Sequence, residues 1–276
     1  DWGSEKPLVE LIKIKEQEFL KNINFIYVDK NSAEKLSKNI SEKFNDELAT
    51  NILASRCKGK FVMYNGADQF LSSNSMSNLI RLLDNKLTDS YKAEERIFLI
   101  PRKTLNESFF KKKPSFEALN YYLDYLNHCN QPYVSTHIHG GGGMGSMVVP
   151  KRILNKIGGY YNEKLPNFGL RSRADNDLLK RSTYYLRHVD LSNFGINVFK
   201  LPRNNKLRNR RIKKINSRIY YSNYEFKDNL NNDWGLEKEK VQIQNILPSQ
   251  IENNIGTQDK LDEIKNFFLE NYKKNN

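Results

Sequence analysis

Cysteine is scarce in this chain, and its scarcity excludes two classes of protein. Among 276 residues only Cys57 and Cys129 occur, so no disulfide framework can form. Neither lies in a Cys-x-x-Cys or Cys/His cluster that would hold zinc. A reducing, intracellular compartment fits this usage best, so we expect a cytoplasmic protein. Long apolar runs are also missing: the longest, such as Phe25–Val28, span four residues, too few to cross a bilayer.

Positive charge is in excess. The chain carries 45 Lys and Arg against 32 Asp and Glu, a net charge of +13. This balance favours anionic partners such as acidic lipids, phosphorylated substrates or nucleic acid, and compositional bias toward Lys and Asn explains it as well. Hydrophobic residues make up 38% and aromatic residues 12%, which suffices for a real core.

Short apolar runs alternate with helical patterns along the first 200 residues, which indicates an open α/β sheet. Such sheets bind ligands at the carboxyl ends of their strands. We predict strands at 25–28, 61–64 and 97–100, a run of strand type at 133–139, and helices at 7–20, 41–55, 75–83, 115–126, 150–157 and from 175 to about 188.

One carboxylate follows a predicted central strand. The run Phe61–Tyr64 ends at Asn65-Gly66, and Asp68 lies in the loop beyond. A rigid strand that delivers a hard oxygen ligand suits Mg²⁺ or Mn²⁺ bound to a diphosphate. An ordinary turn-forming aspartate would leave the same pattern.

A second carboxylate, Asp175, stands where a helix is expected to begin. The helix dipole favours its ionised form, and an ionised carboxylate held in place can accept a proton from a hydroxyl. A plain N-cap is the alternative, and the two roles are compatible.

Three further patterns are less specific. The run Gly140–Gly145 formally satisfies G-x-G-x-x-G but lacks the acidic residue of a dinucleotide site, so we expect a loop that closes over a ligand. The pair His137 and His139 falls on one strand face and could help bind a metal or a phosphate, and an incidental pair explains it as well. The stretch Arg203–Arg218 holds eight basic residues and no acidic one, which suits an anionic surface or a solvated face.

Taken in order, these segments resemble family 2 glycosyltransferases and related GT-A enzymes. Asp1-Trp-Gly-Ser4 is similar to the family's Asp-Asp-Gly-Ser turn, and the stretch from Phe44 to Lys60 to its Asn- and Lys-Gly-containing segment. Gly66-Ala67-Asp68 falls at the Asp-x-Asp metal motif. The family's "GGfdE…EDxDLxxR" block is matched by Gly158-Gly159-Tyr160, Asp175-x-Asp177-Leu178 and Arg181.

The resemblance implies a GT-A domain over residues 1–202, a Rossmann-like mixed sheet flanked by helices, with a basic, mostly helical extension over 203–276. It implies an inverting transfer of a sugar from a nucleotide-diphosphate donor, with UDP-sugars favoured, to a saccharide or lipid-linked acceptor. The expected setting is polysaccharide biosynthesis, in the cytoplasm or at an anionic membrane surface. Nucleic acid is not an expected partner. Asp1 would contact the nucleoside, Asp68 the metal (Mg²⁺ or Mn²⁺) and diphosphate, and Asp175 would be the general base. Arg181 would brace the site, and the nucleotide-sugar site would be completed by Asn51, Gly158, Gly159 and Asp177.

The chain departs from the family at two positions. Gly66 replaces the first Asp of Asp-x-Asp, and Ala174 replaces the Glu before the expected base. These departures favour the alternative, a non-catalytic GT-A-like module for carbohydrate binding or assembly. Because the chain opens at Asp1 without Met, we also expect the family's first strand and helix to precede it.

Overall fold

The chain is described here by a computed structural model. The described residues are 1–5, 7, 23–37, 46–66, 69–105, 113–128, 146–160, 174–191, 194–200, 234–237 and 241–244. The chain divides into two compact units, each assembled from segments far apart in the sequence. The first unit comprises Asp1–Val62, Lys151–Ser182 and Asp228–Asn254, and the second comprises Met63–Pro150, Thr183–Lys227 and Ile255–Asn276.

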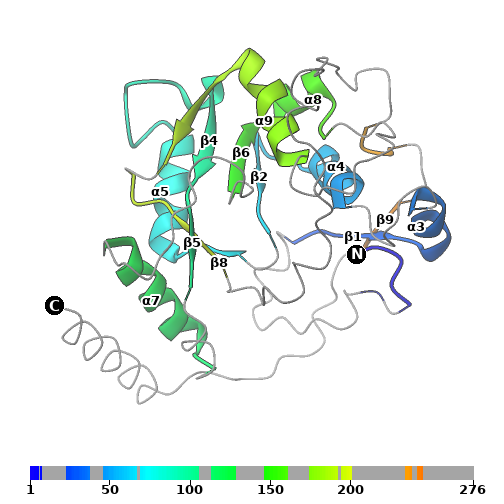
Figure 1. The fold of residues 1–276 in the computed structure, drawn as a ribbon, viewed down its shortest axis with the longest axis horizontal. Coiled ribbons are helices and arrows are strands. Elements are labelled where there is room, and N and C mark those ends of the chain that lie inside the picture. The colour runs from blue at the N-terminus through cyan, green and yellow to red at the C-terminus, as the bar shows by residue number, and fades with distance from the viewer. Residues whose placement is uncertain are drawn as a thin grey trace, which may run out of the picture. The chain divides into compact units, whose positions relative to one another are not determined.

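The first unit contains a two-stranded antiparallel sheet. Strand β1 (Phe25–Val28) pairs with β9 (Val241–Gln244), with Ile26 opposite Ile243 (Figure 1). The strand expected at 25–28 is therefore confirmed. Its partner β9 was not predicted, and it lies in the segment 203–276 that we expected to be a mostly helical extension.

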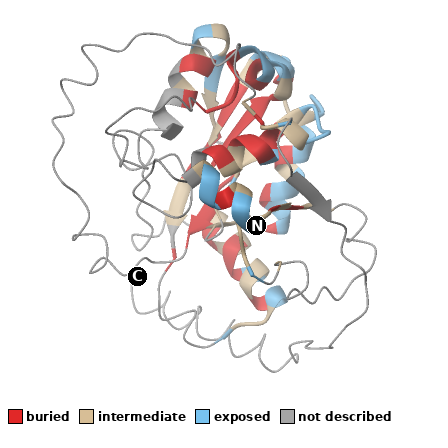
Figure 2. Cartoon of the chain, turned by 90° about the vertical axis from the view of Figure 1, so that its right-hand side faces the viewer, coloured by how far each residue is buried: buried red, intermediate tan, exposed pale blue. Residues whose placement is uncertain are grey.

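The helices of the first unit are α3 (Lys30–Ser37), α4 (Asp46–Arg56), α8 (Lys151–Ile157) and the first nine residues of α9 (Ala174–Tyr185). Helix α4 corresponds to the helix expected at 41–55, whereas α3 was not predicted. Figure 2 colours the buried residues of these elements red. Around β1 the buried core consists of Ile26, Val28, Ala33, Leu48 and Ile52.

The main sheet of the described chain has the order β2-β6-β4-β7. Its strands are β2 (Phe61–Tyr64), β6 (Ser146–Pro150), β4 (Arg96–Ile100) and β7 (Arg187–Asp190). Strand β4 is antiparallel to β6 and parallel to β7, so the sheet is mixed. The predicted mixed α/β class is confirmed at this level.

A smaller sheet in the second unit has the order β3-β8-β5, with β3 (Gln69–Phe70), β8 (Val198–Lys200) and β5 (Arg102–Thr104). Strand β8 is antiparallel to β3 and parallel to β5. Helices α5 (Ser73–Leu83) and α7 (Phe116–His128) and the 3₁₀ turn η1 (Ala93–Glu95) belong to the same unit. One core cluster joins this sheet to α7 through Leu105, Ala118, Tyr122, Leu123, Leu126 and Phe199.

Several boundaries differ from the prediction. Pro150 is the last residue of β6 rather than the first of a helix, and α9 ends at Tyr185, not near His188, because β7 begins at Arg187. Strand β2 stands at the edge of the described sheet, not at its centre, and only Val62 of its four residues is buried. An edge strand is covered on fewer sides, which explains this exposure.

Other predictions fall outside the described residues. They concern nearly all of the helix at 7–20, the strand-type run with His137 and His139, the glycine run 140–145 and the basic stretch 203–218. The boundary expected at Pro202 stays a prediction for the same reason. Among the helices in the described part of the chain, none is both long and apolar enough to cross a membrane.

Candidate functional site

Five of the eight residues that we assigned to the site lie in well-described parts of the first unit: Asp1, Asn51, Gly158, Gly159 and Arg181. Asp175 and Asp177 occupy the first turn of α9, as expected, but their side chains lie outside the described structure. Asp68 is also outside it. The expectation that Asp68 and Asp175 share one cleft therefore stays a prediction.

The two glycines end helix α8, as the sequence predicted. Gly158 and Gly159 have φ angles of 72° and 62°, in the left-handed region that favours glycine. Both backbone N–H groups donate to the carbonyl of Leu154, at 2.9 and 3.1 Å. This left-handed C-cap satisfies a carbonyl that the helix itself would leave unpaired.

The Arg181 side chain binds the backbone of this turn. Its side chain is fully buried and donates to the carbonyls of Ile157 (2.8 Å) and Gly159 (2.6 Å). Because carbonyls at a helix C-terminus carry partial negative charge, they are favourable partners for a guanidinium. The predicted bracing residue thus binds the backbone of the glycine turn.

The Asn51 side chain binds the same turn at Tyr160. Its Nδ2 donates to the carbonyl of Tyr160 at 2.9 Å, and its Oδ1 accepts from the N–H of Tyr160 at 2.7 Å. The side chain is fully buried, so its amide contacts the protein's own backbone. Asn51 therefore holds the turn, and its assignment to the nucleotide-sugar site stays a prediction.

The segment with Trp234 is a neighbour of this turn that our sequence analysis missed. A Cβ on Gly159 would collide with Oδ1 of Asn51 and with the ring of Trp234. The carbonyls of Gly235 and Leu236 accept from the guanidinium of Arg56, at 2.6 and 3.0 Å. The Trp-Gly pair in an otherwise polar stretch is the only local signal that could have revealed this contact.

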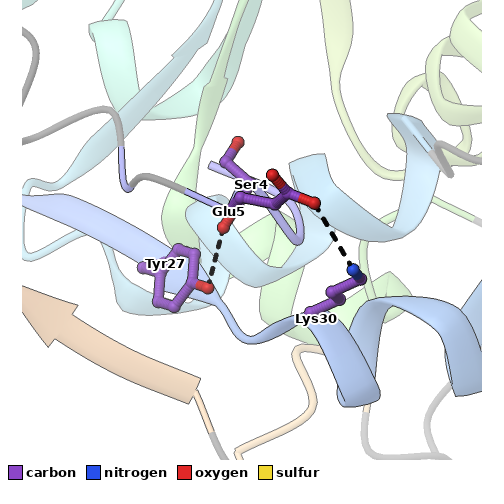
Figure 3. Close-up of polar contacts among 4 residues, drawn as sticks. All are labelled: Ser4, Glu5, Tyr27 and Lys30. Carbon is purple, nitrogen blue, oxygen red and sulfur yellow. Dashed lines mark hydrogen bonds and ion pairs between the residues drawn. The ribbon is translucent and has the colours of Figure 1, made fainter.

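The turn Asp1–Ser4 lies along strand β1. Gly3 has a φ of 66°, and its N–H donates to the carbonyl of Val28 at 2.8 Å. The N–H of Val28 in turn donates to the backbone carbonyl of Asp1 at 2.9 Å. The hydroxyl of Ser4 donates to the Asp1 carboxylate at 2.5 Å. Figure 3 shows the continuation: Tyr27 donates to the Ser4 carbonyl at 3.1 Å, and Lys30 pairs with Glu5 at 3.7 Å. Among these contacts, the one from the Ser4 hydroxyl binds the Asp1 carboxylate.

A second polar cluster lies in the second unit, in the loop after β2. The side-chain Oε1 of Gln69 accepts from the N–H of Gly66 (2.8 Å) and from the hydroxyl of Ser146 (2.9 Å). Ser146 also donates to Oδ1 of Asn65 at 2.6 Å. Sequence reasoning missed Gln69 and Ser146, since neither belongs to a motif.

The described residues of this loop do not fit a divalent metal. Gly66 has no side-chain ligand, and the amides and the hydroxyl around it bind one another. In the described part of the chain, no three His, Cys, Asp or Glu residues cluster to hold an ion. Since Mg²⁺ and Mn²⁺ prefer carboxylate oxygens, a metal here depends on Asp68, and that assignment stays a prediction.

Comparison with known proteins adds no family to this description. No protein-family model matches the chain, and no curated protein is similar to it.

Proposed function

We propose that the chain is a glycosyltransferase that moves a sugar from a nucleotide-diphosphate donor to a saccharide or lipid-linked acceptor. One observation carries the proposal. Three segments selected by the resemblance, containing Asn51, Gly158-Gly159-Tyr160 and Arg181, meet in one buried hydrogen-bonded cluster. The mixed α/β architecture supports it as well.

In the proposed reaction, Asp175 is the general base. It is the second residue of α9, where the helix dipole favours an ionised carboxylate. The acceptor hydroxyl loses its proton to Asp175 as its oxygen attacks the anomeric carbon. The bond between the anomeric carbon and the nucleoside diphosphate breaks, and the diphosphate leaves with the electron pair.

The network around Arg181 has a supporting role in this proposal. Arg181 belongs to α9, and its guanidinium ties that helix to the carbonyls of the glycine turn. Asn51 ties the next residue of the turn to α4. Asp175 would therefore lie on a helix whose position is set by buried hydrogen bonds. A base held in this way needs less reorganisation during the transfer.

We predict that Asp175→Asn lowers the transfer rate by about 10²–10⁴-fold, because an amide cannot accept the proton. Donor affinity should change little, since the side chain keeps its size. The measurement is single-turnover transfer with a panel of UDP-sugars, combined with calorimetric donor binding.

The matched control is Asp89→Asn, which removes an exposed carboxylate from the second unit. It should leave both the rate and the affinity unchanged. If Asp175→Asn turned over as fast as the unaltered chain, Asp175 would not be the base.

The alternative is a non-catalytic module that binds carbohydrate. Gly66 and Ala174, which stand where the family has acidic residues, favour it. Such a module would bind saccharides without hydrolysing or transferring from any nucleotide sugar. A hydrolysis assay with nucleotide sugars, run with and without Mn²⁺, separates the two proposals.

A further inference from the structure

The short segment 234–236 lies against two elements of the first unit that are far from it in the sequence, helix α4 and the glycine turn. A Cβ on Gly159 would collide with the Trp234 ring, so this ring lies directly against the backbone of the turn. The proposed function gives this contact no role. The contacts that hold the segment indicate what that role is.

Three anchors hold the segment on the first unit. The guanidinium of Arg56 donates to the carbonyls of Gly235 and Leu236, at 2.6 and 3.0 Å. The backbone of Gly235 lies so close to the Ser55 side chain that a Cβ would not fit between them. Leu236 packs on the buried core around β1. Because hydrogen bonds from a charged donor are stronger than neutral ones, Arg56 fixes the segment to the end of α4.

The backbone of Leu236 is strained in this position. Its φ is 49°, in the left-handed region that a leucine rarely adopts. A conformation of this kind costs about 1–3 kcal/mol and persists only where the surrounding contacts enforce it. The hydrogen bond from Arg56 and the packing on the core are such contacts. The segment is therefore held in one defined position on α4, and Trp234 with it.

A chain of direct contacts leads from Trp234 to helix α9. The ring lies against Gly159, and the carbonyl of Gly159 accepts from Arg181 at 2.6 Å. Arg181 belongs to α9, whose first turn contains Asp175. We propose that Trp234 is a positioning residue for the transfer: it keeps the glycine turn, and through Arg181 helix α9, in the geometry that the reaction needs. The inference rests on the proposed function for the reaction, and it assigns Trp234 no contact with the substrate.

The first test compares sugar transfer by the full chain with transfer by Trp234→Ala, at a temperature where both are folded. The variant should lower kcat by about 10–100-fold, since a reacting group displaced by about 1 Å costs this much. KM for the donor should not change, because the contact acts on the chemical step. Trp234→Phe keeps an aromatic ring against the turn and should recover most of the rate. An unchanged kcat in Trp234→Ala would overturn the inference.

Arg56→Met tests the same contact from the other end. It removes the hydrogen bonds that hold the segment on α4. It should lower kcat as well, and the double variant should lose little more than Trp234→Ala alone, because both changes release the same ring. Additive losses in kcat would show that the two residues act independently and would reject the inference.

The matched control for stability is Leu36→Ala. Leu36 lies on α3 and packs on the same core as Leu236. The control should lower the melting temperature and leave kcat unchanged. If it lowered kcat as much as Trp234→Ala does, the loss would reflect general destabilisation, and Trp234 would have no positioning role.

Fluorescence gives a readout that does not depend on the reaction. The chain contains two tryptophans, so Trp2→Phe leaves Trp234 as the single emitter. In that background, Arg56→Met should shift the emission to longer wavelength as the ring leaves the turn and meets water. Unshifted emission would show that Arg56 does not hold the ring in place, and the inference would fail.

The outcomes also separate this inference from the proposed function. If the unaltered chain transferred no sugar from any donor, the proposed function would fail, and amide exchange along α9 would decide about the contact chain. Faster exchange in Trp234→Ala than in Leu36→Ala would support a Trp234 that positions α9, and equal exchange would reject it. Sugar transfer that is insensitive to Trp234 would keep the glycosyltransferase and reject the positioning role.

Discussion

Gly159 is held in a backbone conformation and a space that only glycine satisfies. Its φ is 62°, and a Cβ would meet Asn51 and the Trp234 ring. We predict that Gly159→Ala lowers the free energy of unfolding by about 2–4 kcal/mol, from left-handed strain and overpacking together. Urea unfolding monitored by circular dichroism measures it.

Gly195→Ala is the matched control. Gly195 has nearly the same φ, 64°, but no atom of the described residues lies within 4 Å of its ideal Cβ. It should lose only the conformational part, about 1 kcal/mol. Equal losses in the two variants would show that the collision at Gly159 contributes nothing.

Tyr122 provides a pH-dependent prediction. Burial in the α7 core raises the pKa of its phenol to about 12, and Tyr125 adds to the shift. Unfolded tyrosine ionises near 10, so the native state keeps its proton longer. The stability this confers is complete below pH ~10 and is lost as the pH rises toward 12. Ultraviolet titration should show a late step that Tyr122→Phe lacks, and superimposable curves above pH ~11 would contradict the assignment.

Asp29 caps helix α3 from the end of β1. Its carboxylate accepts from the hydroxyl (2.5 Å) and the N–H (3.1 Å) of Ser32, and these bonds lower its pKa. Because the folded pKa is depressed, the cap stabilises above the unfolded pKa, near 3.8, and the effect disappears as the pH falls through the lower folded value.

We predict a small stability difference between Asp29→Asn and the unaltered chain at neutral pH that vanishes in acid. Asparagine still caps a helix but carries no charge, so the comparison isolates ionisation. Carboxyl NMR measures the pKa directly. A titration of Asp29 at or above the model-peptide value would refute the cap's effect.

Helices and strands differed in how well the sequence predicted them. Helices α5 and α7 were placed within two residues at each end, because a 3.6-residue apolar pattern is local. Strand β6 was missed although all five of its residues are buried. Its residues Ser146–Pro150 show no alternation, since the strand lies between β2 and β4 and is covered on both faces. The first residues of strand β7 were predicted as the end of α9. Their strand conformation depends on pairing with β4, which a local pattern does not reveal.

The first unit depends on residues from the far end of the chain. Strand β9 pairs with β1, and the carbonyls of Gly235 and Leu236 bind Arg56. We predict that a fragment of residues 1–202 unfolds on the order of 10 °C below the full chain, since it loses a strand, charged hydrogen bonds and buried apolar area. Thermal unfolding and amide exchange of β1 measure this.

A chain ending at Asn254 is the control, because it retains every segment of the first unit. It should keep the amide protection of β1. If the shorter fragment protected β1 equally well, the segment after Pro202 would be a separate extension, as the sequence suggested. Intermediate melting of the shorter fragment, with exposed β1 amides, would instead support a first unit that is completed by the far end of the chain.

Local signals in the sequence determined the helix at Asp175, the strand at Phe25–Val28 and the glycine stop after Ile157, because each depends on neighbouring residues. Contacts between distant segments needed the tertiary structure. Asn51 meets Tyr160 across 109 positions, and Lys200 on β8 is the register partner of Gln69 on the neighbouring strand β3. Their partners are chosen by burial and by the register of strands, since a buried polar group must find its hydrogen bond wherever the chain brings one.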